Sequence, residues 1–288
     1  MEKAELSQLY IEYKPLLFSL AYKMTGSIAD AEDVIQDVFM KLNQNEMKHG
    51  LHVKAYLCKL VTNRCLDLLK SSKKKRELYI GPWLPEPIAV METDPLQEMM
   101  MKQDMSYALL VLFEQLNPIE RAIFILREVL EYDYETIADI VQKTEPNCRK
   151  ILSRLKKMLP ELEKQLTAVN VDYEQVIASF ISAIQQGNTN QVMEVLREDV
   201  VYYADGGGKV TAAAKPIYGA IRVKQLLTSL AAKYLEEYTI TPTKVNGRMG
   251  IVIKNQTAIL AVMSFEFEGD KIKTIYNILN PDKLKRRR

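Results

Sequence analysis

The sequence predicts a multidomain chain in which two all-α domains are joined by an acidic linker and followed by an α+β domain. Apolar residues recur at helical spacing over residues 1–76 and again over residues 107–166, which indicates amphipathic helices. Residues 77–106 contain four prolines and cannot form one continuous helix. Residues 167–288 hold short runs rich in Ile, Val, Thr and Tyr between turn residues, which is typical of strands in an α+β domain.

Three helices are expected in residues 1–76. The first carries apolar residues at helical spacing from Leu6 to Leu20 and ends before Gly26. The second, from Asp30 to Leu42, has one apolar face surrounded by acids, and the acids at its start suit the helix dipole. The third runs from Val53 to about Ser72 and leads into four consecutive basic residues.

A helix-turn-helix is expected in residues 107–166. Pro146 would lie in the first turn of its second helix, where the missing N–H costs nothing. That helix has an apolar inner stripe and a basic outer face, the arrangement of a DNA-binding helix-turn-helix. The turn carries Gln142-Lys143 where glycine is common, which puts the turn geometry in question. The helices expected in this range are Tyr107–Leu116, Pro118–Val129, Tyr134–Val141 and one from Pro146 to about Leu159.

The formal net charge of +2 hides two basic stripes separated by an acidic linker. Residues 59–76 hold seven Lys or Arg and one acid, and residues 143–157 hold six Lys or Arg and one acid. The linker, residues 77–106, holds six acids and one base. Basic stripes can neutralise phosphates, so both are candidate nucleic-acid surfaces. The acidic face at residues 30–37 is wrong for DNA and suits a basic protein partner.

Several classes of function are not expected. The sequence has no apolar run of about 18 residues, and its first ten residues include acids and no signal-peptide core. We therefore expect a cytoplasmic protein with no membrane contact. The cysteines Cys58, Cys65 and Cys148 are too few and too scattered for a disulfide framework and are expected to be buried thiols. No metal site, cofactor or catalytic residue is expected, because both histidines lie in the N-terminal part of the chain.

Two short motifs lie outside the predicted helices. DGGGK, from Asp205 to Lys209, lacks the spacing of a nucleotide-binding P-loop and indicates backbone with positive φ. Asp205 and Lys209 are expected either to pair with each other or to bind a partner. WLPEP, from Trp83 to Pro87, contains the one tryptophan of the chain. We expect that indole to anchor on another surface rather than stand exposed.

These segments resemble a known family. DAEDVIQDVFMKL (30–42) followed by KAYLCKLVTNRCLDLLKSSKKKR (54–76) is similar to region 2 of extracytoplasmic-function (ECF) sigma factors. LNPIERAIFILREV (116–129) with YDYETIADIVQKTEPNCRKILSRLKKML (132–159) is similar to region 4. WLPEP, DGGGK and NPDKL (280–284) together resemble the subgroup with a fused SnoaL-like C-terminal domain, ECF group 41 or SigJ-type. The implied domains are region 2 at 1–76, the linker at 77–106, region 4 at 107–166, and a SnoaL-like domain with a cone-shaped curved sheet at 167–288.

The resemblance also implies functional sites at matching positions of this sequence. The acidic helix would bind the clamp helices of the RNA polymerase β′ subunit through Asp30, Glu32, Asp33, Gln36 and Asp37. The third helix would recognise and melt the −10 promoter element through Tyr56, Asn63, Arg64, Lys70, Lys73 and Lys74. The helix-turn-helix would read the −35 element through Thr144, Asn147, Arg149, Lys150, Ser153, Arg154 and Lys157. An interdomain regulatory contact would use Trp83, Leu84, Pro85, Glu86, Pro87, Asp205, Gly206, Gly207, Gly208, Lys209, Asn280, Pro281, Asp282, Lys283 and Leu284.

The implied function is that of a sigma factor that binds core RNA polymerase, including its β flap, and directs it to promoter DNA. The C-terminal domain would dock on the sigma domains and linker in place of a separate anti-sigma factor, with Trp83 at the centre of the contact. SnoaL-like folds elsewhere include enzymes with a pocket, which leaves a small-molecule ligand open. Two alternatives remain: a stand-alone helix-turn-helix regulator, and a SnoaL-like enzyme domain with a DNA-binding appendage. The first of these gives the acidic helix no purpose.

Overall fold

The computed structural model describes residues 3–44, 52–89, 106–161, 173–234 and 237–285, and its chain divides into two compact units. The helical unit comprises Met1–Glu77 and Leu109–Thr167. The sheet unit comprises Leu78–Ala108 and Ala168–Arg288. The described residues of the linker therefore pack with the C-terminal domain, and the two helical domains form one body.

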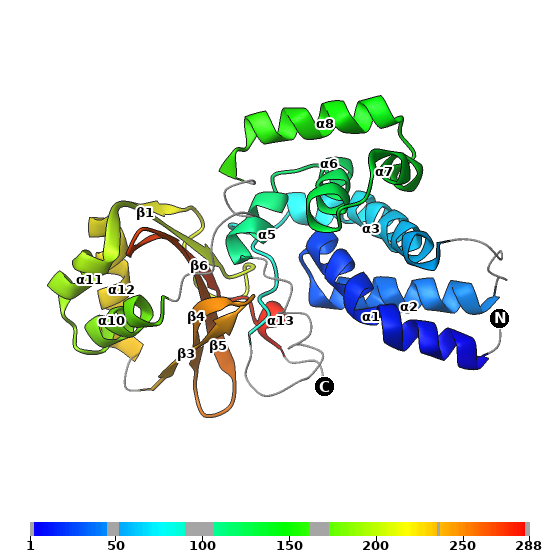
Figure 1. The fold of residues 1–288 in the computed structure, drawn as a ribbon. Helices are drawn as coiled ribbons and strands as arrows, with labels where there is room; N and C mark the ends of the chain where they lie inside the picture. The colour runs from blue at the N-terminus through cyan, green and yellow to red at the C-terminus, as the bar shows by residue number, and fades with distance from the viewer. Residues whose placement is uncertain (1–2, 45–51, 90–105, 162–172, 235–236, 286–288) are drawn as a thin grey trace. The chain divides into compact units, whose positions relative to one another are not determined.

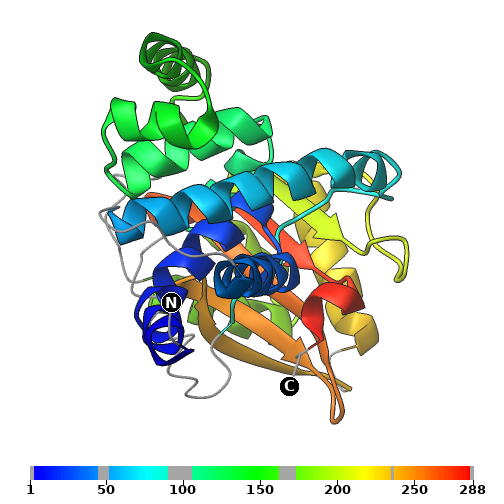
Figure 2. The same cartoon turned by 90° about the vertical axis from the view of Figure 1, so that its right-hand side faces the viewer.

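The first part of the helical unit consists of three helices (Figure 1). They are α1 (Lys3–Thr25), α2 (Ile28–Gln44) and α3 (Val53–Glu77). The first two are separated by Gly26, whose φ of 68° is the left-handed conformation that ends many helices. Ser27 then caps α2, because its Oγ accepts from the Asp30 N–H at 3.2 Å. Figure 2 shows α3 crossing α2 rather than running alongside it.

The second part of the helical unit contains the helix-turn-helix. Its elements are α5 (Tyr107–Phe113), α6 (Pro118–Phe124), the π-helical η1 (Ile125–Val129), α7 (Tyr134–Val141) and α8 (Glu145–Met158). A capping box joins Asn117 and Glu120 at the start of α6. The sequence predicted one α-helix through Val129, but the backbone changes to π-helical hydrogen bonding at Ile125. The first helix also ends three residues earlier than Leu116, at Phe113.

The core of the helical unit is formed by apolar residues from both parts, including Leu17, Leu57 and Phe124, each fully buried. Cys58, Cys65 and Cys148 are buried free thiols, which confirms the expectation from their spacing. Burial raises the pKa of the Cys65 thiol well above its ordinary value. These cysteines therefore act as small apolar residues of the core.

The sheet unit consists of a six-stranded mixed sheet and its helices (Figure 1). The strand order is β2-β1-β6-β5-β4-β3, with β1 and β6 parallel and every other neighbouring pair antiparallel. Strands β3 to β6 follow one another as an antiparallel meander, and β1 and β2 extend its edge. The elements are α10 (Glu174–Gln185), α11 (Thr189–Val195), β1 (Leu196–Asp205), β2 (Ile217–Tyr218), α12 (Ala220–Tyr234), β3 (Thr239–Val245), β4 (Arg248–Lys254), β5 (Ile259–Glu268), β6 (Lys271–Ile278) and α13 (Pro281–Leu284).

The two faces of this sheet have different coverings. One face packs against α10, α11 and α12 in a large apolar core that includes Phe180, Leu227 and Ile251. The opposite face carries a small cluster of Val245, Val252 and Val262, against which Ala89 of the linker and Leu284 of α13 pack. The observed architecture confirms the expected fold class of helical domains followed by an α+β domain. Among the described residues no helix is both long and apolar enough to cross a membrane.

Candidate functional sites

The helix-turn-helix owes its turn to an unusual backbone conformation at Gln142. Its φ of 53° and ψ of 51° are left-handed, the conformation for which glycine is usual. The Lys143 N–H then donates to the Ala138 carbonyl at 3.0 Å, which closes the end of α7. The absence of glycine therefore leaves the turn geometry intact. At the start of α7, the Asp133 side chain accepts from the Thr136 backbone N–H at 2.7 Å, and this bond lowers the pKa of Asp133.

The second helix, α8, buries one stripe and exposes the other. Cys148, Leu152 and Leu155 are buried against the rest of the helical unit. The seven side chains assigned to the −35 element are all exposed, namely Thr144, Asn147, Arg149, Lys150, Ser153, Arg154 and Lys157. An exposed basic face on a helix of 14 residues has the dimensions needed to enter a DNA major groove.

Two arginines of this face are already held in place by neighbouring groups. Arg149 pairs with Glu145 one turn earlier, and its guanidinium lies 4.2 Å from the centre of the Tyr134 ring. Arg154 pairs with Glu120 of α6. Lys150 and Lys157 have no ion pair within the described part of the chain, so their charges are available to phosphates.

An ion pair joins the acidic helix α2 to the basic helix α3. The Arg64 Nε donates to Asp37 Oδ2 at 2.8 Å, with both side chains partly exposed. Glu32, Asp33 and Gln36 are exposed, while Asp30 and Asp37 are half-buried. Sequence reasoning assigned Asp37 to polymerase and Arg64 to DNA, and it missed that the two side chains pair.

The remaining residues assigned to the −10 element lie along α3. Tyr56 and Asn63 are half-buried, and Lys70 is exposed with its Nζ 3.5 Å from an oxygen of Asp67. The side chains of Lys73 and Lys74 lie outside the described residues. The side chains of this surface are therefore described only as far as Ser71, before the four consecutive basic residues.

Two contacts that the sequence did not signal hold the two parts of the helical unit together. The buried Arg121 of α6 donates to the Met24 carbonyl at the end of α1 at 2.6 Å and to Glu114 at 2.8 Å. The Lys59 Nζ of α3 lies 2.7 Å from Asp139 of α7. The described parts of the segments assigned to the −10 and −35 elements are thereby packed into one body.

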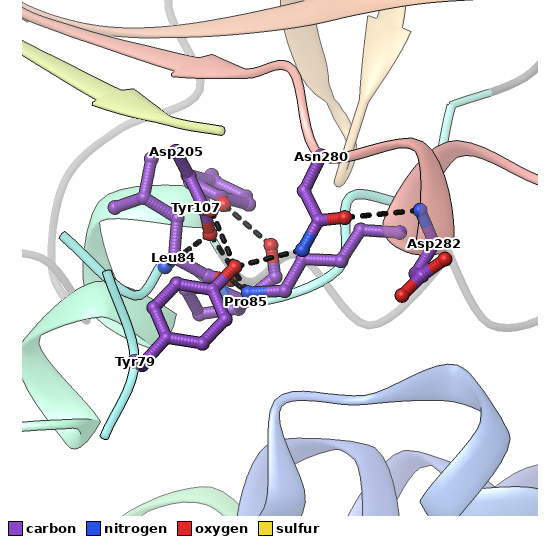
Figure 3. A network of polar contacts seen from close by, with 8 residues as sticks. Tyr79, Leu84, Pro85, Tyr107, Asp205, Asn280 and Asp282 are labelled. Atoms are coloured by element: carbon purple, nitrogen blue, oxygen red, sulfur yellow. Dashed lines mark hydrogen bonds and ion pairs between the residues drawn. The ribbon is translucent and has the colours of Figure 1, made fainter. Parts of the chain in front are cut away.

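The linker is bound to the C-terminal domain through the carboxylate of Asp205, at the end of β1 (Figure 3). Asp205 is fully buried and accepts from the Tyr79 hydroxyl at 2.5 Å and from the Leu84 backbone N–H at 2.9 Å. The Lys283 Nζ completes the site at 2.8 Å from Asp205 Oδ2. A buried carboxylate needs such partners, because burying an unpaired charge is costly. Burial and the bond to Asp205 together raise the pKa of Tyr79 above its ordinary value.

Lys283 joins the linker to α13 in two further ways. Its ammonium donates to the Leu84 carbonyl oxygen and lies 3.9 Å from the centre of the Trp83 ring. The half-buried Trp83 therefore covers a cation, and its neighbour Leu84 is more deeply buried, at 2% exposed. The sequence expectation placed Trp83 at the hydrophobic centre of the contact.

The glycines of DGGGK allow close approach of the linker and the segment before α13. Gly207 and Gly208 have φ of 58° and 69°, as the sequence indicated. A Cβ at Gly207 would collide with the side chain of Asn280 and lie 2.9 Å from the Tyr79 hydroxyl. Asp205 and Lys209 do not pair with each other, because Asp205 binds Lys283 and Lys209 pairs with Asp282.

Sequence reasoning assigned Asn280 to this contact but missed several of its other residues. Asn280 Nδ2 donates at 2.8 Å to the hydroxyl of Tyr79, which was not assigned. Farther along the linker, Ile88 and Asn246 exchange two hydrogen bonds, since the Ile88 N–H donates to Asn246 Oδ1 and the Asn246 N–H donates to the Ile88 carbonyl. The sequence does carry a signal at Asn246, which stands before Gly247, because an Asn-Gly pair favours a turn in which the asparagine side chain can hydrogen-bond to backbone. Of the other assigned residues, Pro85 and Pro87 are buried, Gly206 is buried, and Glu86, Pro281 and Leu284 are half-buried.

Known proteins share this order of domains. The Sigma-70 region 2 family matches residues 9–75 and the Sigma-70, region 4 family matches residues 106–159. The chain is 26% identical over 284 residues to the ECF RNA polymerase sigma factor SigJ of Mycobacterium tuberculosis, covering 93% of this chain and 89% of that protein. It is 25% identical over 281 residues to the probable ECF RNA polymerase sigma factor SigI of the same species, covering 97% and 94%.

A solved structure extends the likeness to the fold. The crystal structure of the M. tuberculosis extracytoplasmic function sigma factor SigJ matches with a TM-score of 0.77 at 24% identity, and the match covers 96% of this chain and 97% of that one. The match extends over the six-stranded mixed sheet of the C-terminal domain as well as the helical domains. The chain therefore carries the Sigma-70 region 2 and region 4 domains, and over nearly its whole length it is similar to ECF RNA polymerase sigma factors.

Proposed function

We propose that this sigma factor acts in the cytoplasm, binds core RNA polymerase and directs it to promoters through two separate DNA-reading helices. The exposed acids of α2 would contact the β′ clamp helices, and the region 4 helices would contact the β flap. α3 would recognise and melt the −10 element, and α8 would read the −35 element. The exposed basic face of α8 and the exposed acids of α2 support these assignments.

We infer further that the described arrangement is a closed one. Two elements named −10 and −35 are about 25 base pairs apart, which is about 85 Å along B-DNA. The helices α3 and α7 are in contact through Lys59 and Asp139, and α7 is joined directly to α8. From this arrangement α3 and α8 cannot reach both promoter elements at once. The contact between α3 and α7 would therefore open when the protein binds a promoter.

The linker contact is the observation that carries a regulatory role for the C-terminal domain. Tyr79, near the start of the linker, is bonded to Asp205, and Tyr107, directly after the linker, packs on Tyr276 of β6. Both ends of the linker are thereby attached to the same sheet. A linker of about 30 residues spans up to about 100 Å when extended, but one with both ends fixed to a single body cannot separate the domains. Docking would therefore hold the factor closed.

Run-off transcription with core polymerase tests this function. The full chain is compared with a chain that ends at Leu166 and so lacks the C-terminal domain. We expect both to support promoter-dependent transcription and the shorter chain to give more product, because its linker is free. Failure of both chains to start transcription would contradict the sigma-factor function. Equal output would contradict regulation by the linker contact alone, and tight promoter binding without polymerase would favour a stand-alone regulator.

A further inference from the structure

A cavity of about 510 Å³ lies on the helix-covered side of the sheet. Its wall is formed by α10, α12 and the concave side of strands β1 and β3 to β6, and most of the lining is aliphatic or aromatic, as at Phe180, Leu227 and Met263. Protein cores are packed with few voids larger than a water molecule. A space of this size is instead in the range of small-molecule sites.

The cavity contains a polar pair among these apolar residues. Tyr202 of β1 and Asn277 of β6 both line it, and each is 2% exposed. Asn277 Nδ2 donates to the Tyr202 hydroxyl oxygen at 2.6 Å. The Asn277 Oδ1 atom is buried and has no hydrogen-bond partner among the described residues. Nearly all buried polar atoms in proteins are satisfied, so an orphaned acceptor in a cavity wall points to a missing donor.

The hydrogen-bonding groups of Asn277 and Tyr202 define which chemical group can donate to Asn277 Oδ1. Asn277 Oδ1 needs a donated hydrogen, and the Tyr202 hydroxyl, which accepts from Asn277, still has its own hydrogen to give. A single hydroxyl group can donate to the first and accept from the second. An ether or ketone offers no hydrogen to Asn277, and a pure hydrocarbon satisfies neither residue.

We propose that this cavity is a binding site for a largely apolar small molecule that carries a hydroxyl group, with the hydroxyl held between Asn277 and Tyr202. The rest of the molecule would fill the cavity and pack against its aliphatic and aromatic lining. Residues 210–213 form part of the same wall and directly follow the DGGGK loop, whose first residue binds the linker.

Calorimetric titration of the full chain tests the site with two matched probes. We use para-phenylphenol, which has a hydroxyl group, and para-methoxybiphenyl, which has the same rings and an acceptor but no donor. We expect the phenol to bind about tenfold more tightly, the effect of one buried hydrogen bond. Binding of neither probe, or equal binding of both, would overturn the proposal.

Two variants locate the hydroxyl. Asn277→Leu removes the acceptor at nearly constant volume and is expected to reduce the preference for the phenol to about twofold or less. Thr274→Val, on the same strand with its hydroxyl bonded to Glu266 instead, should leave the preference unchanged. If Asn277→Leu does not fold, Tyr202→Phe replaces it. This variant deletes the donor to the ligand oxygen, which both probes use, so both probes should bind less tightly while the preference for the phenol remains. A preference that persists in folded Asn277→Leu, or unchanged affinity of both probes for Tyr202→Phe, would overturn the proposed geometry.

Discussion

The Tyr107 hydroxyl donates a hydrogen bond of 2.6 Å to the carbonyl oxygen of Pro85, 22 residues earlier in the chain. Tyr107 is 1% exposed, and its ring lies 5.6 Å from that of Tyr276 in β6. This bond joins the WLPEP segment to the residue that follows the linker. It therefore ties one end of the linker to the other on the surface of a single sheet.

Replacing Tyr107 with phenylalanine tests this tie. Tyr107→Phe leaves the ring in place but strips the Pro85 carbonyl of its buried donor, at a cost of about 1–2 kcal/mol. If docking holds the factor closed, promoter output should rise about fivefold or more. Run-off transcription with core polymerase measures the change. Tyr203→Phe is the control, because its ring also stacks on Tyr276 but its hydroxyl makes no bond to the described part of the linker. Unchanged output in Tyr107→Phe would argue against control through this end of the linker.

Removing the charge of Asp205 should undock the other end. Asp205→Asn leaves Lys283, whose side chain is 8% exposed, without its buried counter-ion, and such a loss costs about 3 kcal/mol. Denaturant unfolding can be followed by fluorescence of Trp83, the one tryptophan, which lies against Lys283. The double variant Asp205→Asn with Lys283→Met should recover part of the loss, because no unpaired charge remains. Equal stability of the single variant and the unchanged chain would contradict the central role of this carboxylate.

The helices and most strands of this protein could be predicted from local pattern, but the linker contact could not. The α7 bounds follow directly from Ile137 and Val141 on one face and a cap at Asp133. Asp205, by contrast, takes its partners from positions 121 and 126 residues earlier and 78 residues later. No periodicity links residues so far apart. The residue-level signals were the glycines beside Asp205 and the lone tryptophan of the linker, and the resemblance alone brought these segments together.

Two other features were hidden for different physical reasons. The turn at Gln142 lacks the expected glycine because a polar residue can adopt the left-handed conformation at a modest energetic cost, which the turn overcomes with hydrogen bonds. The Arg64 and Asp37 pair was invisible because each residue fits its own helix face, and only the crossing of α2 and α3 brings the two together.

The stability of the helical unit should rise with pH above neutrality because of Lys23. This lysine is 4% exposed, and burial lowers its pKa to about 8 from an ordinary 10.5. Between those values the unfolded chain binds a proton that the folded chain does not, so stability increases with pH. We expect a gain of about 2 kcal/mol between about pH 7.5 and about pH 9.5. Urea unfolding followed by helical circular dichroism measures it.

The Lys23→Met variant provides the matched comparison. Its stability should be nearly independent of pH over this window, because no titrating group replaces the lysine. Lys14→Met, on the same helix but only half-buried, should keep the rise. A rise of equal size in Lys23→Met would assign it to other groups.

Asn147 and Lys157 of α8 should affect promoter binding in different ways. An exposed asparagine near the start of the helix can contact a base edge, so Asn147→Ala should relax preference at one −35 position by about 1–3 kcal/mol. Lys157→Ala removes a charge near the end of the helix and should weaken binding to all sequences alike. It should also reduce the salt slope of binding by about one. Holoenzyme binding to a set of −35 variants at several salt concentrations separates the two effects, and identical profiles would refute the division of roles.

Two acids of α2 should have different effects. Asp33 should affect only binding of core polymerase, and Asp37 should affect both polymerase binding and opening of the −10 element. Asp33 is exposed, so Asp33→Lys reverses the charge of the proposed polymerase face without touching α3. We expect it to weaken core polymerase binding at least tenfold in a pull-down titration. Asp37→Asn also releases Arg64 from an ion pair of 2.7 Å, so it should alter opening of the −10 element as well. Permanganate footprinting of the melted strand detects that second effect.

Comparing DNA melting by the Asp33→Lys and Asp37→Asn holoenzymes decides whether the Asp37–Arg64 ion pair affects promoter opening. Asp33→Lys holoenzyme, assembled at high polymerase concentration, should melt promoters normally, because Arg64 keeps its position. Asp37→Asn holoenzyme assembled in the same way should show a changed pattern of open bases, since an arginine released from its carboxylate can reach a different phosphate. If both variants melt DNA alike, the Asp37–Arg64 pair only stabilises the packing of α2 on α3. If Asp33→Lys binds polymerase normally, the acidic face of α2 is not the polymerase surface.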